Sequence, residues 1–384
     1  MKTLRLTHII FRRQILTLFA LICCAGIIRA SLPQYSVAPE NSFPAVAPGT
    51  STRLIVNSAA FGDEMIVDIW FPPAYSPSAP GGFPVIYAHD GQNLFDPAKS
   101  YSSVAWELDK TCADLADKGL ITPPIVVGIH NRGEKNLRPN DYFPEKAALL
   151  ISDPQKTESC IWDTCASGFL GDEHAAFVAT KLKPLIYHLY NTASDRSHTF
   201  AIGSSMGGLA SLYLLCEYPW IFGGAACLST HWVGSLSIDS DFTMHPDPLC
   251  SEAILSYMDQ NLPDPATHKL YLDEGTAGWD AGYLPYEEKA RAIARNHGYS
   301  ETDASLMTFD AVGADHNEWF WQQRVDRPLK FLLGNPKSGL KPIAVNDAES
   351  YAPAYLPNGI LATTDTPRGI RLSRHSRSLT PQSH

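Results

Sequence analysis

Short apolar runs alternate along the chain with longer stretches of helical periodicity. The runs predicted as strands are residues 53–57, 65–71, 85–88, 125–129, 199–202, 224–228, 269–272 and 306–309. The first two are expected to be antiparallel edge strands, and helical stretches separate the later ones. The pattern predicts a doubly wound, mostly parallel sheet with helices on both faces, an α/β fold of the hydrolase type. Ligand sites in such sheets lie beyond the carboxyl ends of the strands.

The segment 198–219, HTFAIGSSMGGLASLYLLCEYP, has the pattern of a strand, a tight turn and a helix. Ser205 lies in the turn, within a Gly-x-Ser-x-Gly motif. Gly203 and Gly207 are expected to admit a positive φ and close backbone contacts there. Such a turn exposes a serine hydroxyl for nucleophilic attack on an acyl carbonyl. Because the bare motif is common by chance, the strand and helix around it carry the interpretation.

A serine nucleophile needs a base, and in this arrangement the base comes last in the chain. His316 is predicted for this role, since it follows the run 306–309 in AVGADHNEWFW, between a last strand and a last helix. Most other histidines fall in the leader, in helical patterns or in polar segments. Those that flank predicted strand ends and could line the site are His89, His130, His174 and His231.

The carboxylate that orients the histidine is expected after the strand 269–272, within LDEGTAGWDAGY. Asp280 is favoured because it stands beyond a glycine-containing turn, from which a carboxylate can reach back to a histidine. Asp273 is the alternative acid, although a strand-end carboxylate also serves to bond loop amides. Glu274 is a weaker third choice.

Two backbone amides are expected to form an oxyanion hole. The first is the amide of Met206, directly after the serine. The second is the amide of Gln92, in a turn that follows the buried run 85–88, where Gly91 leaves room for the backbone. The alternative for this segment is an ordinary Asp-Gly turn.

The connection 130–172 is long enough to suggest a role in substrate choice. Further contacts are expected from aromatic residues at the same rim, which could stack on a sugar ring or an aromatic acyl group, or could simply pack the loops. The predicted substrate-binding residues are His89, Asp90, Gly91, Arg132, Trp232 and Trp279.

Composition indicates one globular domain, with 384 residues of which 45% are hydrophobic. A net charge of −10 and a pI near 5.7 argue against nucleic acid or an anionic membrane as partner. A small-molecule or polysaccharide-linked ester fits better. The predicted chemistry needs no metal and no organic cofactor, and the cysteine spacings do not resemble a zinc site.

The N-terminal residues 1–30 combine basic residues with the apolar stretch 15–28 and are predicted to be a signal peptide, with an uncleaved anchor as the alternative. Arg12 and Arg13 are compatible with twin-arginine export. The remaining chain is expected to comprise a linker (31–51), a catalytic domain (52–334) and a disordered tail (335–384). A secreted or periplasmic location follows from this prediction.

Export into an oxidising compartment makes disulfides possible. Cys160 and Cys165 are the predicted pair, because they bracket a short irregular segment. The thiols in the serine helix and in the next strand are expected to be buried and free. Cys112 and Cys250 could pair or stay free.

The motifs YAHDGQNLFD, GSSMGG and GADHNEWFW occur in this order along the chain. With them, residues 52–334 resemble the "putative esterase" family of the α/β-hydrolase superfamily, which includes enterochelin-esterase-like and feruloyl or acetyl-xylan esterase-like enzymes. The resemblance implies that Ser205 is the nucleophile, that His316 is the base and that the HDGQN turn forms part of the oxyanion site, whereas the acid varies among relatives.

The expected activity is that of an exported serine ester hydrolase working through an acyl-enzyme. The same residues could serve an acyltransferase or a thioesterase. The alternative of another class is a non-catalytic binding protein that keeps the hydrolase scaffold.

Overall fold

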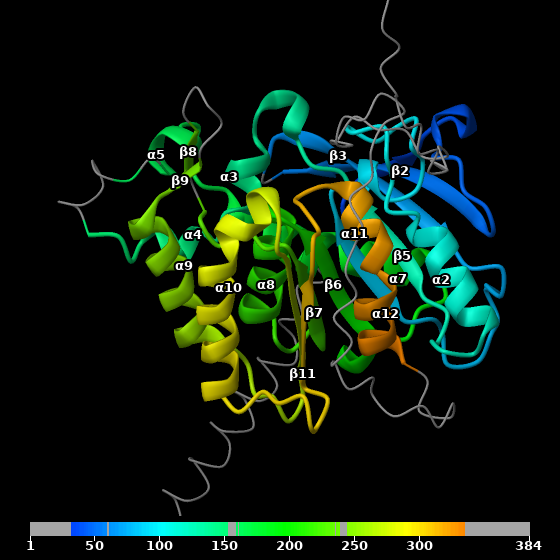
Figure 1. The fold of residues 1–384 in the computed structure, drawn as a ribbon. Helices are drawn as coiled ribbons and strands as arrows, with labels where there is room; N and C mark the ends of the chain where they lie inside the picture. Colours follow the sequence, from blue (N-terminus) through cyan, green and yellow to red (C-terminus); the bar gives the residue numbers. More distant parts are fainter. Residues whose placement is uncertain are drawn as a thin grey trace, which may run out of the picture. The chain divides into compact units, whose positions relative to one another are not determined.

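A mostly parallel sheet forms the centre of the fold (Figure 1). Its strands, in spatial order, are β1 (Tyr35–Val37), β2 (Thr50–Ser58), β3 (Asp63–Phe71), β5 (Ile125–Ile129), β4 (Val85–His89), β6 (Thr199–Ser204), β7 (Gly224–Leu228), β10 (Lys269–Gly275) and β11 (Leu306–Ala311). Neighbours from β5 to β11 are parallel, whereas the pairs β1–β2, β2–β3 and β3–β5 are antiparallel. The predicted α/β fold is confirmed.

The computed structural model describes residues 32–59, 61–152, 159, 161–234, 236–238 and 244–334. The predicted signal peptide and the predicted C-terminal tail therefore lie outside the described residues. The chain divides into two units, Met1–Pro33 and Gln34–His384, and every element named here belongs to the second. None of the helices in the described part of the chain is both long and apolar enough to cross a membrane.

Helices connect most of the strands. They are α2 (Leu108–Asp117), α3 (Arg138–Tyr142), α4 (Glu145–Ala148), α5 (Ile161–Thr164), α6 (Gly171–Phe177), α7 (Lys183–Leu189), α8 (Met206–Glu217), α9 (Pro248–Asn261), α10 (Gly278–Asn296), α11 (Glu318–Arg324) and α12 (Asp326–Leu333). The short 3₁₀ or π turns are η1 (Glu40–Ser42), η2 (Gly91–Asn93), η3 (Gly133–Lys135), η5 (Val178–Leu182) and η6 (Arg196–His198). A separate antiparallel pair, β8 (Leu236–Ile238) with β9 (Met244–Pro246), was not predicted.

The helices cover both faces of the sheet (Figure 1). Along β4, Val85 and Tyr87 join the core cluster under α8 and α9, whereas Ile86 and Ala88 join the cluster under α2 and α12. A strand buried on both faces is continuously apolar, which is the pattern that identified it in the sequence.

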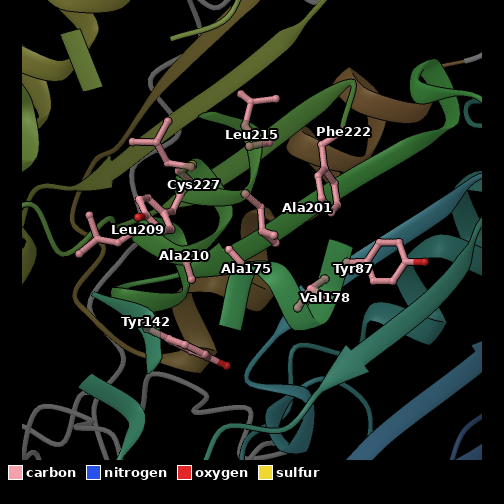
Figure 2. Packing of buried hydrophobic residues seen from close by; sticks show 14 of the residues in the cluster. Tyr87, Tyr142, Ala175, Val178, Ala201, Leu209, Ala210, Leu215, Phe222 and Cys227 are labelled. Carbon is pink, nitrogen blue, oxygen red and sulfur yellow. The ribbon is translucent and has the colours of Figure 1, made fainter. Parts of the chain in front are cut away.

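Helix α8 lies in the centre of the larger cluster, and all of its residues before Glu217 are buried. It therefore lacks the polar face of a surface helix. Figure 2 shows this packing, in which the labelled residues of α8 are Leu209, Ala210 and Leu215, with Ala201 of β6 and Cys227 of β7 among their neighbours.

The predicted linker 31–51 is wrong in part, because this segment contributes the outer strand of the sheet. Residues Tyr35, Ser36 and Val37 of β1 pair antiparallel with β2. All three side chains are exposed, so the strand is held by backbone hydrogen bonds and leaves no hydrophobic alternation in the sequence. Strands β2 and β3 are antiparallel as predicted, but β1 occupies the edge and β3 pairs with β5.

The connection 130–172 is partly helical, with η3, α3, α4 and α5 inside it. In this segment Cys165 is a buried free thiol, and Cys160 lies outside the described residues. The predicted Cys160–Cys165 disulfide falls partly outside the described residues and stays a prediction. The amide of Cys165 bonds to the carbonyl of Ile161 at the end of α5, and its side chain packs in the apolar core. Burial raises the pKa of this thiol to about 12.

The remaining described cysteines are all buried. Cys216 in α8 and Cys227 in β7 are free thiols, as expected. Cys112 and Cys250 belong to core clusters on opposite faces of the sheet, so they do not pair with each other.

Truncating the core at α8 should destabilise the whole domain. Leu214 is fully buried, so Leu214→Ala should lower the free energy of unfolding by about 2–5 kcal/mol. Leu149 is 76% exposed, and Leu149→Ala should change it by less than about 0.5 kcal/mol. Urea unfolding of both variants measures the difference, and equal losses would contradict the placement of α8 in the core.

Candidate active site

The serine of the Gly-x-Ser-x-Gly motif occupies a sharp turn between β6 and α8. Ser205 has φ 56° and ψ −127°, a conformation that L-residues rarely adopt. Its amide donates to the carbonyl of Leu228 at the end of β7, over 2.9 Å. Its carbonyl accepts from the amides of Gly208 and His231, over 3.0 and 3.1 Å. The turn is thus bonded to neighbouring elements at both of its backbone polar groups.

The flanking glycines allow close approach and do not supply the positive φ, contrary to the prediction. A Cβ on Gly203 would overlap the backbone of Gly207, and a Cβ on Gly207 would lie 3.1 Å from Asp90 Oδ2 and from His89 Cβ. The positive φ belongs to Ser205 itself. The absence of a side chain at Gly207 therefore lets the turn after β4 approach the serine turn.

The turn after β4 is packed as closely against β5. Asp90 has φ 58°, and η2 begins at the next residue. A Cβ on Gly91 would lie 2.6 Å from the carbonyl oxygen of Gly128. Gly91 is therefore required for packing, and the turn that it forms carries Gln92 toward the site.

The amides of Gln92 and Met206 donate to no protein acceptor among the described residues. Met206 is the first residue of α8, where the helix leaves its amides without intrahelical partners and its dipole favours negative charge. Both amides are thus available to a ligand, as the oxyanion-hole prediction requires.

An ion pair holds the turn after β4 from the side of α3. Arg138 donates from Nε to Asp90 Oδ1 over 2.9 Å and from Nη2 to Asp90 Oδ2 over 2.8 Å. Asn131 Nδ2 donates to Asp90 Oδ1 over 2.5 Å. Burial alone would raise the pKa of Asp90, but the Arg138 charge and these hydrogen bonds hold it below its ordinary value. Both oxygens of Asp90 are therefore bonded to protein groups, and its contact with substrate stays a prediction.

The predicted base and acid are hydrogen-bonded to each other. His316 Nδ1 lies 2.6 Å from Asp280 Oδ1. His316 follows β11 on the loop before α11, as predicted, whereas Asp280 lies in the first turn of α10 and not on a loop. The Asp280 side chain is fully buried, which would raise its pKa, but the charge and hydrogen bond of His316 and the charge of Arg324 lower it below the ordinary value.

Ser229, just after β7, bonds to the second oxygen of the Asp280 carboxylate. Ser229 follows β7 and donates from Oγ to Asp280 Oδ2 over 2.6 Å, and the amide of Gly275 donates to the same oxygen over 3.0 Å. Ser229 Oγ also accepts from Arg324 Nη2 over 2.6 Å and from Trp321 Nε1 over 3.0 Å. The orientation of Asp280 thus depends on residues from four elements.

The alternative acid, Asp273, bonds to the residues that hold Asp280 and not to His316. Its two oxygens accept from Arg324 Nη2 and Nε over 3.0 and 3.1 Å, and the pair is completely buried. Asp273 also accepts from the amide of Ser229 and from the hydroxyl of Tyr271. All of its hydrogen bonds therefore go to groups other than His316.

Aromatic rings surround His316 on the remaining sides. The rings of Trp321 and Tyr283 lie 5.1 and 5.2 Å from it between centroids, in edge-to-face contact, and Trp279 lies at 6.3 Å. Trp279 is 40% exposed, so of the predicted aromatic contacts it is the one that a substrate could reach.

Three residues predicted to bind substrate have buried side chains that are already bonded to protein groups. His89 is completely buried and bonds through Nδ1 to Ser211 Oγ over 3.0 Å. Arg132 donates from two nitrogens to Asp141, and Trp232 is fully buried and bonded to a glutamate of α10. The role of Gly91 is packing, as described above. Arg138 lies in the connection 130–172, which was expected to influence substrate choice, but its pairing with Asp90 was not predicted.

In the part of the chain that the structure describes, no group of three or more histidine, cysteine, aspartate or glutamate side chains is arranged to hold a metal ion. The polar groups of the candidate site are a serine hydroxyl, an imidazole bonded to a carboxylate, and two amides without a protein acceptor among the described residues. His231 links the serine turn to the imidazole, because its amide bonds to Ser205 and its ring packs against Tyr283, which packs against His316. This set of polar groups can carry out acyl transfer through a covalent intermediate.

Comparison with known protein families shows which family this chain belongs to. The profile of the family described as "Putative esterase" matches residues 58–326, well over half of the chain. The chain belongs to this esterase family. The match includes the serine turn, Asp280 and His316, so all of them lie within the region that defines the family.

Individual relatives are distant. The chain is 27% identical over 279 residues to the uncharacterised protein YbbA of Bacillus subtilis (strain 168), covering 71% of this chain and 94% of YbbA. Among solved structures, a ferulic acid esterase from Anaeromyces mucronatus in complex with ferulic acid has a TM-score of 0.52 at 16% identity, over 77% of this chain and 97% of that one. The enterobactin esterase of Shigella flexneri has a TM-score of 0.51 at 13% identity, over 77% and 62%. These similarities support the esterase fold.

The two aspartates should differ in what their loss affects. Asp280→Asn removes the acceptor for His316 Nδ1, and turnover of an ester should fall by roughly 10²- to 10⁴-fold with the fold intact. Asp273→Asn disrupts a buried ion pair, and the free energy of unfolding should fall by about 3–5 kcal/mol. Turnover and urea unfolding of both variants test this, and the opposite pattern would move the acid to Asp273.

A third carboxyl group lies in the same region. Glu274, at the end of β10, is completely buried; no donor among the described residues bonds to its oxygens, and its protonated form can bond to Asp280. Burial, together with the negative charges of Asp280 and Glu287, raises its pKa well above the ordinary value of 4.5. Burial and the charge on Asp280 therefore both favour the protonated form of Glu274 in the folded protein.

This protonation should make stability depend on pH. The folded protein keeps a proton on Glu274 that the unfolded chain releases above about pH 4.5, so folding becomes less favourable as pH rises, by about 1.4 kcal/mol per unit. Glu274→Gln should remove this slope and be more stable than the wild type at pH 8 but not at pH 4. Exposed Glu288→Gln is the control. Parallel curves of unfolding free energy against pH for the wild type and Glu274→Gln would contradict a neutral Glu274.

Proposed function

We propose that this esterase is an exported serine hydrolase that cleaves carboxylic esters through an acyl-enzyme. The observation that carries the proposal is the 2.6 Å hydrogen bond between His316 Nδ1 and the buried Asp280 carboxylate, in a protein whose Ser205 lies in a strained strand-to-helix turn. Export is supported by the basic and apolar pattern of residues 1–30.

The imidazole would act as the base because its proton is fixed on one nitrogen. An ionised Asp280 can only accept, so Nδ1 of His316 carries the proton and Nε2 is left as an acceptor. In the first step, Nε2 takes the proton of Ser205 Oγ as that oxygen attacks the ester carbonyl. Asp280 stabilises the imidazolium that forms, and it stays ionised.

The amides of Gln92 and Met206 would bind the negative charge that develops on the carbonyl oxygen. The tetrahedral intermediate then collapses, the bond to the alcohol oxygen breaks, and the imidazolium at His316 gives its proton to the departing alcohol. A water molecule enters, loses a proton to His316 Nε2 and attacks the acyl group on Ser205. The acid leaves, and the serine hydroxyl is restored.

The turn after β4 would be held for this task by Arg138. The oxyanion amide of Gln92 is two residues from Asp90, and the Arg138–Asp90 pair with Asn131 holds Asp90 at positive φ. Preorganised donors of this kind are worth most when they do not move as charge develops. The ion pair therefore belongs to the catalytic arrangement as a positioning element.

The role of Ser205 as the nucleophile is the first part of the proposal to test. Ser205→Ala should lower hydrolysis of a p-nitrophenyl ester by roughly 10⁴-fold or more while the unfolding curve stays close to that of the wild type. Ser204→Ala, at the adjacent buried position, is the matched control and should remain active. A fluorophosphonate probe should label the wild type and not Ser205→Ala. Retention of activity or labelling in Ser205→Ala would overturn the proposal.

A further inference from the structure

His231 stands beside the serine without a role in the proposed steps. Its amide donates to the carbonyl of Ser205 over 3.1 Å, so its backbone is fixed to the serine turn. Its ring contacts Tyr283 edge-to-face at 5.3 Å between centroids, and Tyr283 contacts His316 in the same way at 5.2 Å. The phenol ring therefore packs against both imidazoles.

The hydrogen bond between His231 and Tyr283 has one favourable direction. His231 Nδ1 lies 2.8 Å from the hydroxyl oxygen of Tyr283, and within the described residues this nitrogen is the hydroxyl's only partner. Burial, with the negative charge of Asp280, raises the pKa of Tyr283, so the hydroxyl keeps its proton. Leaving the buried hydroxyl of Tyr283 without an acceptor would lower the stability of the folded protein by about 1–3 kcal/mol. Tyr283 therefore donates, and His231 Nδ1 accepts.

This direction places the proton of His231 on the opposite nitrogen. Burial, together with the positive charges of His316 and Arg138, lowers the pKa of His231 to about 3, so the ring is neutral near pH 7. A neutral imidazole that accepts at Nδ1 carries its hydrogen on Nε2. In the described structure Nε2 has no protein partner, and it is not among the buried polar atoms. His231 thus presents a fixed N–H donor to solvent beside Ser205.

Two other histidines near the site, His89 and His174, do not offer an accessible ring nitrogen to a ligand. His89 Nε2 and both ring nitrogens of His174 have no partner either, but they are completely enclosed and no ligand can reach them. His231 combines an available donor, partial exposure and a backbone bond to Ser205.

We infer that the Nε2–H of His231 donates to an oxygen of the substrate next to the scissile ester, so that the site selects esters with a hydroxyl or carbonyl oxygen there over plain alkyl esters. Tyr283 is a positioning residue in this assignment, because it fixes the tautomer of His231 and does not touch the substrate. The inference rests on the proposed function, since it concerns the substrate of the same serine.

The tautomer can be measured without activity. Imidazole ¹⁵N NMR of the uniformly labelled full chain, with the His231 signals identified by their absence in His231→Phe, should show a neutral ring protonated on Nε2 at pH 7. In Tyr283→Phe the packing of the ring is kept and only the hydroxyl is lost, so Nδ1 should gain a fraction of the proton. A wild-type ring protonated on Nδ1, or a charged ring, would overturn the inference.

Selectivity is the second measurement. The substrates are ethyl butyrate, ethyl 3-hydroxybutyrate with a hydroxyl in the acyl part, and 2-hydroxyethyl butyrate with a hydroxyl in the alcohol part. The wild type should prefer one hydroxylated ester, and Tyr283→Phe and His231→Phe should lose about 3- to 10-fold in kcat/KM for it, mainly through KM, relative to ethyl butyrate. Tyr286→Phe, on the same helix, is the control.

Two outcomes separate this inference from the proposed function. Equal losses of kcat on all three esters would place His231 at the oxyanion or in the fold and would overturn the inference, while ester hydrolysis through Ser205 would stand. Hydrolysis that survives in Ser205→Ala would overturn both. If His231→Phe does not fold, the Tyr283→Phe measurements decide alone.

Discussion

The buried negative charge of Asp280 is the constraint on which the rest of the site depends. A carboxylate removed from water must be compensated by hydrogen bonds and opposite charge, or it takes up a proton. Here the compensation comes from His316, from Ser229 and from the more distant guanidinium of Arg324. His316 and Ser229 follow different strands, and Arg324 belongs to α11. The strands of the sheet must therefore be in place before these groups can stabilise the negative charge of Asp280. Glu274, six residues earlier in the chain, receives no such donors among the described residues, and its pKa is raised.

The position of the site follows from the order in which the chain builds the sheet. From β4 the chain goes to β5 on one side and then returns to place β6 on the other side of β4. In open α/β sheets, such a reversal marks the place beyond the carboxyl ends of the strands where ligands bind. The turn after β4 supplies Gln92 and the turn after β6 supplies Ser205. The oxyanion amides therefore lie where the topology opens the sheet.

The features that could be predicted from the sequence are those that depend on a local pattern of residues. Buried strands are continuous apolar runs, the serine turn has its own motif, and His316 lies between a strand and a helix, so each could be located without tertiary information. The strand β1 could not be found because its side chains are exposed and its pairing uses the backbone alone. The partners of Asp273 and Asp90 could not be found either, since Arg324 and Arg138 are separated from them by 51 and 48 residues. The burial of Trp232 and Arg132 likewise depends on neighbours that the local pattern does not identify.

One consequence concerns the strand that carries the histidine. Among the described strands, β11 is the last in the chain and forms one of the two edges of the sheet, where it pairs with β10. The ribosome makes this segment after the other described strands, so under the proposed mechanism Ser205 and the amides of Gln92 and Met206 precede His316 in synthesis. Local opening of a protein costs less free energy than global unfolding. Hydrolysis that depends on His316 would therefore require β11 to be paired, and activity would be lost when this edge strand opens.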